Sequence, residues 1–302
     1  MVRIEHQFVA MGGPCCIRLD SANAELAQVA LQCAQREVQR LEQKFSRYLP
    51  DSITSTINRQ AGTRQPVVID PETKGLLQYA DTLWHRSEGM FDLTSGILRK
   101  AWNFKSTRLP EQAELNKLLA LVGWDKVIHD GESVYLPEPG MELDFGGYVK
   151  EYACDAAAGI LKRHGISSAL VDLGGDMATT GNQADGTPWV VGIRHPETPG
   201  QAIAQVSVGA GGLATSGDYE RAMLIADKRY GHILNPKTGW PVEGLVAISL
   251  LAEQCLVAGS AATIAMLKPQ AQALTWLKEL GLPWLAVDQN GQCYGTIAQT
   301  QD

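Results

Sequence analysis

One histidine of this chain lies in a segment whose residue types suit proton transfer. His232 opens residues 232–239 (HILNPKTG), in which an Asn-Pro and a Thr-Gly pair predict a turn directly after a strand. Imidazole is the side chain whose ordinary pKa lies near neutral pH, so His232 could accept the proton of an attacking hydroxyl group. A hydrogen-bonded structural histidine is the alternative interpretation. The other five histidines do not have the spacing typical of zinc sites.

Two glycine pairs beside aspartates could bind phosphate groups. Residues 143–150 (LDFGGYVK) place Asp144 and two glycines before a predicted helix, where free backbone N–H groups and the helix dipole favour anions. Alternatively, Asp144 is only a helix cap and the glycines only form a turn. Residues 171–176 (VDLGGD) place the second pair at the end of a buried strand, where a ligand contact and a simple tight turn fit equally well. Neither segment has the G-x-G-x-x-G pattern of a dinucleotide-binding fold.

Two further segments are rich in hydroxyl and small side chains. Residues 214–219 (ATSGDY) combine Thr215 with a serine, a glycine and a carboxylate, which fits a ligand contact or a plain polar loop. Residues 258–263 (AGSAAT) place small residues in a predicted helix, so that a pyrophosphate could approach closely and Thr263 could offer a hydroxyl ligand. Small residues on a packed helix face explain the same pattern nearly as well.

The elements that position these segments follow from hydrophobic periodicity. Apolar residues recur every three or four positions after residue 147, which predicts a helix ending at His164-Gly165, and the apolar run at residues 168–173 predicts a buried strand after it. Residues 4–20 predict two strands joined by a turn at residues 11–14. Further helices are expected at residues 21–45, 71–89, 255–267 and 270–280, and further strands at residues 189–193, 202–208, 230–234, 246–251, 284–288 and 292–296.

Composition and the order of the elements limit the fold and the partners. Helices and strands do not alternate strictly, which favours an α+β fold with mixed sheets flanked by helices over a doubly wound parallel sheet. The 302 residues contain no repeat or long linker, so we expect residues 1–302 to form a single domain, which two subdomains could build around a cleft. A net charge of −7 and the absence of long basic runs argue against nucleic-acid binding.

The sequence also predicts where in the cell the protein is located. The chain begins without an apolar stretch of signal-peptide length and contains no run of 18 apolar residues, so we expect no stable membrane insertion and a cytoplasmic location. A periplasmic location would fit a chain trimmed of its signal. Six cysteines without a C-x-x-C pair predict buried free thiols, which agrees with a reducing compartment.

Taken together and in order, six segments of this chain resemble the ApbE family of flavin transferases, which move FMN from FAD onto a threonine of a protein. The resemblance extends from residue 11 to about residue 266. Its carriers are residues 45–52 (FSRYLPDS), 91–94 (FDLT) with 102–104 (WNF), 143–150 (LDFGGYVK), 173–176 (LGGD), 214–219 (ATSGDY) and 232–239 (HILNPKTG). The resemblance implies an α+β body that clamps FAD in a cleft.

The resemblance also implies roles for single residues. Aromatic and apolar side chains would cover the flavin rings, a carboxylate would accept from adenine or ribose, and Lys150 with the glycine turn would meet the pyrophosphate charge. His232 would be the catalytic base for the incoming threonine hydroxyl. The expected flavin contacts are Met11, Tyr48, Phe91, Asp92, Asp144, Lys150 and Leu234, to which we add Thr215.

The expected magnesium site departs from the family pattern. In the family, a helix carries an aspartate and, four residues later, a threonine, which together hold the Mg²⁺ that bridges the diphosphate. The threonine corresponds to Thr263, but the aspartate position is Gly259, and Gly147 can contribute only a backbone carbonyl. Since a carboxylate is lost, we expect weaker Mg²⁺ binding. Glu151 replaces the glycine that usually follows the family lysine, and spacing alone leaves open whether it compensates.

The implied activity is that of an FAD:protein FMN transferase. The enzyme would bind FAD and Mg²⁺, attach FMN covalently to a threonine of a target flavoprotein, and release AMP. Two alternatives remain open: a non-catalytic FAD-binding carrier or regulatory protein with a degenerate metal site, and a pyrophosphatase that hydrolyses FAD to FMN and AMP. Family targets are flavoprotein subunits of membrane-bound redox complexes or soluble flavin reductases, and the sequence does not indicate which protein is modified here.

Overall fold

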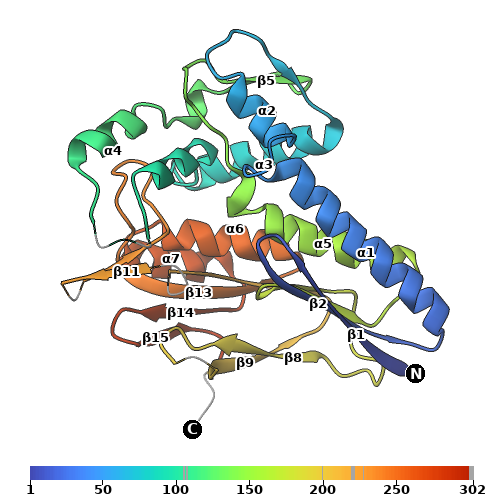
Figure 1. The fold of residues 1–302 in the computed structure, drawn as a ribbon. Coiled ribbons are helices and arrows are strands. Elements are labelled where there is room, and N and C mark those ends of the chain that lie inside the picture. The colour runs from blue at the N-terminus through green and yellow to red at the C-terminus, as the bar shows by residue number, and fades with distance from the viewer. Residues whose placement is uncertain (105, 107, 199, 219–221, 227, 299–302) are drawn as a thin grey trace.

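An eight-stranded sheet forms the centre of the protein (Figure 1). The computed structural model describes residues 1–104, 106, 108–198, 200–218, 222–226 and 228–298. In spatial order, the strands of the sheet are β1 (Val2–Ala10), β2 (Gly13–Ser21), β6 (Ala169–Leu173), β7 (Asp176–Thr179), β10 (Gly211–Gly217), β13 (Leu245–Ala252), β14 (Trp284–Asp288) and β15 (Cys293–Gly295). Each neighbouring pair runs antiparallel, which confirms the α+β prediction and excludes a doubly wound parallel sheet.

Helices cover one face of the sheet. α1 (Ala24–Phe45), α5 (Val149–Arg163) and α6 (Cys255–Met266) pack side by side there, and α7 (Gln270–Leu280) packs against α6 (Figure 1). α3 (Pro71–Arg86) contacts α6 through the Tyr79 hydroxyl, which lies 3.1 Å from Oγ of Ser260. Four of these helices begin within one residue of the predicted position. α1 begins three residues later than predicted, because Asn23 caps it by accepting from the N–H of Leu26.

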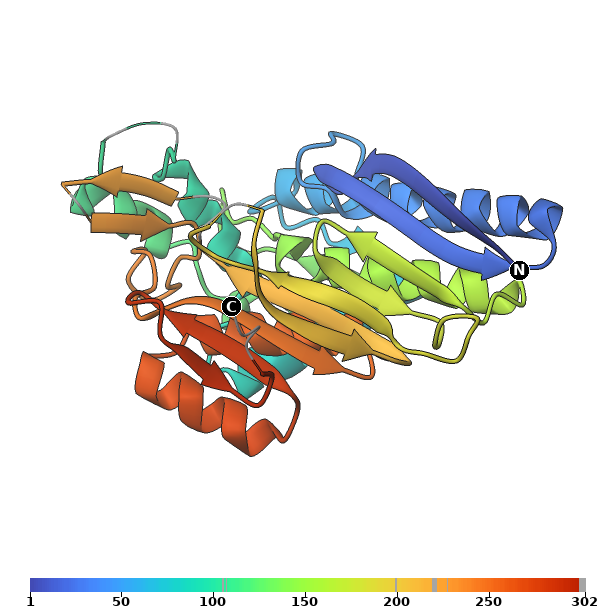
Figure 2. The same ribbon diagram turned by 90° about the horizontal axis from the view of Figure 1, so that it is seen from below.

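The opposite face of the sheet carries a hairpin. β8 (Trp189–Arg194) and β9 (Ala202–Val208) form it, and Figure 2 shows it from below. Val191 and Ile193 of this hairpin pack in one apolar cluster with Leu213 of β10 and Leu285 of β14. Because side chains alternate along a strand, the neighbouring Ala214 belongs instead to the core under the helices. Strand β10 therefore presents one set of side chains to the hairpin and the other set to the helices.

Short elements, which hydrophobic periodicity did not predict, make up much of the remaining structure. One or two turns of helix, or two to four strand residues, are too short to show a period. Two strands of the main sheet were also not predicted. β7 has only four residues, and β10 consists largely of glycine and hydroxyl residues, which show little periodicity. The short elements are α2 (Ile53–Arg59), η1 (Leu93–Lys100), α4 (Gln112–Leu119), η2 (Trp124–Lys126), η3 (Phe145–Gly147), β3 (Val67–Val68), β4 (Ile128–His129), β5 (Ser133–Tyr135), β11 (Ala222–Ile225) and β12 (Lys228–Gly231).

The strand expected at residues 230–234 is wrong in its position. β12 ends at Gly231, and Leu234 makes only an isolated bridge with Pro241. The reason lies in the turn that follows. The Asn235 side-chain oxygen accepts from the N–H of Lys237 at 2.8 Å, which bends the chain, and proline has no N–H with which to continue a ladder. The strand predictions at residues 189–193, 202–208, 246–251 and 284–288 are confirmed with small shifts at their ends.

The six cysteines are free thiols, as predicted. Cys15, Cys154 and Cys255 are buried, whereas the other three are half-buried, so the predicted burial holds for half of them. None of the helices in the described part of the chain combines the length and the apolar character needed to cross a bilayer.

Candidate active site

Strand β10 brings three parts of the molecule together at its carboxyl end. The backbone N–H of Thr215 donates to Oδ1 of Asp176 at 3.2 Å, and the Thr215 hydroxyl lies 2.7 Å from Oγ of Ser249 on β13. The next residue, Ser216, faces the helices, with its Oγ 2.6 Å from Oγ1 of Thr263 on α6. One strand thus connects Thr215 and Thr263, two residues that the sequence placed in separate segments.

A buried ion pair lies beside this strand. Lys150, at the start of α5, reaches Asp176 of β7, and its Nζ lies 2.9 Å from Oδ2. Asp176 is only 2% exposed, and burial raises its pKa while Lys150 opposes that shift. Burial lowers the pKa of Lys150, but the carboxylates of Asp176 and Glu151 outweigh burial and raise this pKa overall. Lys150 is therefore held in its charged form by the neighbouring carboxylates.

A cavity of about 600 Å³ opens next to the ion pair. Lys150 and Thr215 line it together with the turn between β6 and β7. In this turn Gly174 and Gly175 both have positive φ, and the Asp172 side chain accepts from the N–H of Gly175 at 2.8 Å. The tight turn that the sequence allowed is therefore present, and it also borders the cavity. Because glycine has no side chain, a ligand can approach the backbone closely there.

The turn between β1 and β2 borders the same cavity. Val9 and Pro14, on either side of the turn, line the cavity, and the carbonyl oxygen of Pro14 lies close to Gly174. Met11 stands at the tip with a φ of +53° and is half-buried against the main core. The structure thus brings the turn that carries Met11 to the edge of the cavity that Lys150 lines, although the two segments are far apart in the sequence.

Aromatic residues lie near the start of α5. A Cβ added to Gly147 would lie 3.1 Å from Cζ of the buried Phe91, so this glycine allows the ring to pack directly on the backbone. Asp92, the neighbour of Phe91, is buried and caps η1, and it accepts from the N–H groups of Thr94 and Trp124 at 2.7 and 2.9 Å. Both carboxylate oxygens of Asp92 are therefore engaged in holding the local backbone.

Asp144 occupies a second capped turn. Its carboxylate accepts from the N–H of Gly146 at 2.9 Å and caps η3, so the predicted capping role is observed one short helix before α5. The same carboxylate forms an ion pair with Arg47. The Arg47 guanidinium lies over the ring of Tyr48, 4.6 Å from its centroid, and donates to the Tyr48 hydroxyl at 2.6 Å. Since Tyr48 is 75% exposed, its ring is free to cover a bound ligand.

The segment that contains His232 also meets the end of β10. Gly231, the residue before His232, packs against Asp218, and a Cβ added there would lie 2.5 Å from Cβ of Asp218. Asp218 follows directly after Gly217, which lines the cavity, and burial raises the pKa of Asp218. Leu234 is partly buried in an apolar cluster around Trp102. Tyr219, the last residue of the predicted segment 214–219, lies outside the described residues.

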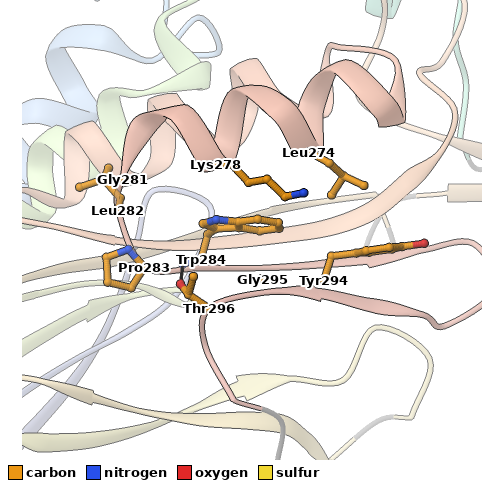
Figure 3. A pocket seen from close by; sticks show the side chains of 9 residues that line it. All are labelled: Leu274, Lys278, Gly281, Leu282, Pro283, Trp284, Tyr294, Gly295 and Thr296. Atoms are coloured by element: carbon orange, nitrogen blue, oxygen red, sulfur yellow. Dashed lines mark hydrogen bonds between the residues drawn. The ribbon is translucent and has the colours of Figure 1, made fainter.

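A second cavity lies elsewhere in the fold. It has a volume of about 550 Å³ and lies between α7 and the hairpin of β14 and β15 (Figure 3). Lys278 and Leu274 extend from α7 toward the rings of Trp284 and Tyr294. Its lining includes none of the residues predicted from the sequence for the site.

Comparison with known proteins identifies the family. The sequence model of the ApbE family matches residues 11–285. The chain belongs to the ApbE family. Two relatives are named FAD:protein FMN transferase: one from Klebsiella pneumoniae, 32% identical over 79% of this chain and 73% of the relative, and one from Treponema pallidum, 32% identical over 90% of this chain and 80% of the relative. This member of the ApbE family is therefore an enzyme of the transferase class.

Solved structures agree with this assignment. The ApbE protein of Thermotoga maritima superposes with a TM-score of 0.89 at 27% identity, covering 98% of this chain and 97% of that one. The apo form of the Pseudomonas stutzeri flavinyl transferase ApbE superposes with a TM-score of 0.85 at 26% identity, covering 99% and 95%. The predicted fold is thus confirmed as that of the ApbE flavin transferases.

Gly259 is the position at which this ApbE chain lacks the expected aspartate. It lies in α6, four residues before Thr263, and is buried. A Cβ added to Gly259 would lie 2.6 Å from both Cγ and Oε1 of Glu151 on α5. The space over Gly259 is therefore already filled, and it is filled by a carboxylate. Burial, together with the negative charge of Asp176, raises the pKa of Glu151.

The described part of the chain contains no group of three or more histidine, cysteine, aspartate or glutamate side chains arranged to hold a metal ion.

The structure assembles some predicted residues and separates others. Lys150 and Thr215 line one cavity, Thr263 is linked to it through Ser216, and the backbone next to His232 reaches the same strand. Tyr48, Asp144, Phe91 and Gly147 form a second group before α5. Sequence reasoning did not assign roles to Asp176, Ser216 or Arg47, although all three lie within the quoted segments. Their only signal was a polar side chain directly beside a glycine turn or an aromatic residue.

Proposed function

We propose that this ApbE family enzyme is an FAD:protein FMN transferase that binds FAD in the cavity beside Lys150 and attaches FMN to a threonine of a target flavoprotein. The main observation is the junction at the end of β10, where the charged Lys150, the glycine turn and the segment before His232 converge. A cation next to accessible backbone suits a diphosphate, because phosphate oxygens accept from both.

For the other predicted residues we infer supporting roles at the bound FAD. We infer that Met11, Tyr48, Phe91 and Leu234 provide apolar or aromatic contact to the flavin or adenine rings, since ring faces pack on such groups. Asp144, whose two oxygens already accept from Gly146 and Arg47, would support the site by fixing the turn before α5 and the guanidinium beside Tyr48. Asp92, whose oxygens already accept from the backbone, supports the site by fixing η1 behind Phe91.

The transfer step needs a base and an electrostatic clamp. In our proposal, the threonine hydroxyl of the target attacks the phosphorus on the FMN side of the diphosphate while His232 accepts the hydroxyl proton. A bond forms between the threonine oxygen and phosphorus, and the bond from that phosphorus to the bridging oxygen breaks, so that AMP leaves with the electron pair. Lys150 stabilises the negative charge that builds on the phosphate oxygens.

The residues beside Thr263 fit a divalent cation. Thr263 and Ser216 offer hydroxyl oxygens, and Glu151 brings a buried carboxylate to Gly259, one turn before Thr263 on α6. The resemblance to the family adds the backbone carbonyl of Gly147, four residues before Glu151. Oxygen donors of this kind suit Mg²⁺. When bound, Mg²⁺ would neutralise charge on the diphosphate and so favour departure of AMP.

The transferase can be tested directly with FAD and Mg²⁺. We would incubate the enzyme with a flavoprotein subunit that another ApbE family member modifies, and then look for in-gel flavin fluorescence and the FMN mass increment. The expected result is fluorescence that remains on the subunit after denaturation, with release of one AMP per label. A subunit with its acceptor threonine changed to alanine should remain unlabelled.

A matched pair of histidine variants tests the base. His232→Ala should lower the labelling rate by about 10²- to 10⁴-fold, the usual contribution of a general base. His85→Ala, which changes an exposed histidine on α3, should label at the wild-type rate. AMP and free FMN without labelling would instead indicate a pyrophosphatase. Tight FAD binding with neither AMP nor label would indicate a carrier.

A further inference from the structure

We propose that Glu151 supplies from α5 the cation-binding carboxylate that α6 lacks at Gly259. The site would take a hard divalent cation, Mg²⁺ or Mn²⁺, together with the diphosphate of FAD. This inference rests on the proposed function, because the diphosphate completes the set of oxygen ligands. It concerns a position at which this chain departs from its family.

The packing of α5 against α6 shows that the two positions share one space. A Cβ at residue 259 would collide with Cγ and Oε1 of Glu151 at 2.6 Å, whereas non-bonded carbon atoms are comfortable near 3.5 to 4 Å. An aspartate at residue 259 would therefore require the present Glu151 side chain to move away. The glutamate carboxylate stands where a side chain from α6 would begin.

Glu151 has the chemistry of an incomplete site. It is 7% exposed, and its Oε2 atom accepts no hydrogen bond from any residue that the structure describes. A buried carboxylate oxygen without a hydrogen-bond partner is costly, so such an atom points to a missing cation. Two nearby carboxylates are already used. Asp176 is paired with Lys150, and Asp155 accepts from the first backbone N–H groups of α6, those of residues 255 and 256.

The local charge also favours a cation. Glu151, Asp176 and Lys150 together carry one net negative charge when ionised. Glu151 and Asp176 are buried, and Lys150 is half-buried. Thr263 lies one turn after Gly259 on the same face of α6, with its hydroxyl 2.6 Å from that of Ser216. One carboxylate and two hydroxyl groups thus lie along one face of α6, where α5 and β10 pack against this helix. A hard cation prefers such oxygen ligands.

The decisive experiment measures how Mg²⁺ changes the affinity for FAD. FAD would be titrated with protein in EDTA and in excess Mg²⁺, without any acceptor protein, and flavin fluorescence would report binding. In the wild-type enzyme we expect Mg²⁺ to tighten FAD binding by about tenfold or more, within the usual range of coupling between two ligands. In Glu151→Gln the enhancement should fall below about threefold, while FAD binding in EDTA should stay equal or become tighter because a negative charge near the diphosphate is gone.

Two further variants control this experiment. Glu279→Gln removes one exposed carboxylate from α7 and should keep the full Mg²⁺ enhancement. The double variant Glu151→Gly with Gly259→Asp moves the carboxylate back to α6 and should recover an enhancement within about threefold of the wild type. Thermal unfolding followed by circular dichroism checks that each variant is folded.

The outcomes separate this inference from the proposed function. An equal Mg²⁺ enhancement in the wild type and in Glu151→Gln would overturn the role of Glu151 and leave the transferase proposal intact. Two other results would also overturn the role of Glu151 and leave the transferase proposal intact. One is FAD binding by the wild type without any Mg²⁺ effect, and the other is a double variant that remains as insensitive to Mg²⁺ as Glu151→Gln. No FAD binding by the wild type in either buffer would overturn the proposed function itself.

Discussion

Two buried carboxylates at different places along the central sheet have opposite surroundings. Asp20, at the end of β2, is 8% exposed, and it accepts from Arg3 through both oxygens at 2.8 and 2.9 Å. It also accepts from Oγ of Ser168 and from the N–H of Ala184. Glu151 is 7% exposed, and its Oε2 accepts from no described residue. Equal burial therefore does not imply an equal role.

The pKa values of the two groups reflect this difference. The hydrogen bonds from Arg3 outweigh burial and lower the pKa of Asp20 to about 2. Burial dominates at Glu151 and raises its pKa. A carboxylate that is fully hydrogen-bonded stabilises the fold, whereas one that is buried with an unbonded oxygen destabilises it until a ligand arrives. The comparison separates a structural site near β2 from a functional site at the contact of α5 and α6.

Removal of the Lys150 ammonium group, which lies beside Asp176 and Glu151, should give the largest effect on stability. Lys150→Met would leave two buried carboxylates, Asp176 and Glu151, without their only described cationic neighbour. Because Lys150 is partly exposed, we expect a loss of about 2–4 kcal/mol in the free energy of unfolding, near the low end of the range for broken buried pairs. Urea denaturation at pH 8 in EDTA, followed by circular dichroism, measures it. Arg3→Met, which removes a more exposed cation from Asp20, should lose less unfolding free energy than Lys150→Met. The opposite order would contradict this comparison of the two sites.

Neutralisation of Asp20 should have a smaller cost of the same sign. Asp20→Asn loses the ion pair with Arg3, and its amide NH₂ group would face donors where an oxygen now accepts. We expect a loss of about 2 kcal/mol in the free energy of unfolding at pH 7. The labelling rate of the folded variant should stay at the wild-type value. A slower transfer rate would show that the region near β2 also serves the active site.

The same change at Glu151 should have the opposite sign. Glu151→Gln removes a buried charge that has no described partner at Oε2, so the protein in EDTA should become more stable by about 1 kcal/mol at pH 9. With FAD and Mg²⁺ present, the wild type should gain more stability than the variant, because a ligand stabilises the state that binds it. Thermal unfolding in both buffers measures the two shifts. A destabilised variant in EDTA would indicate that Glu151 has a structural partner.

Acid should weaken the region near β2 selectively. The pKa of Asp20 is lowered to about 2 in the folded protein, so its stabilising contribution is present above the ordinary carboxyl pKa and is lost as pH falls toward 2. Since the guanidinium of Arg3 is half-exposed and screened, we expect this contribution to be about 1 kcal/mol. Unfolding free energies at pH 6 and pH 3 should thus differ less for Asp20→Asn than for the wild type. Parallel pH curves would remove Asp20 as the cause.

Much of the framework was predictable from the sequence because it depends on local signals. The periodicity after residue 147 gave α5, and the run that follows gave β6, since long apolar patterns are hard to satisfy in another way. The ordered motifs indicated the family. Strand β10 was missed, although its end connects Thr215 and Ser216 to the rest of the site, because glycine and hydroxyl residues carry little periodic signal.

The sequence by itself determined the residue types, namely a base candidate in His232, a lysine before a regular helix, and an aspartate position occupied by Gly259. It did not determine whether the missing carboxylate is replaced. Only the tertiary structure decided that, because Glu151 and Gly259 are 108 positions apart and meet through the packing of α5 on α6. Contact between helices depends on the three-dimensional path of the chain, and a single sequence without that path does not reveal which side chain fills a given space.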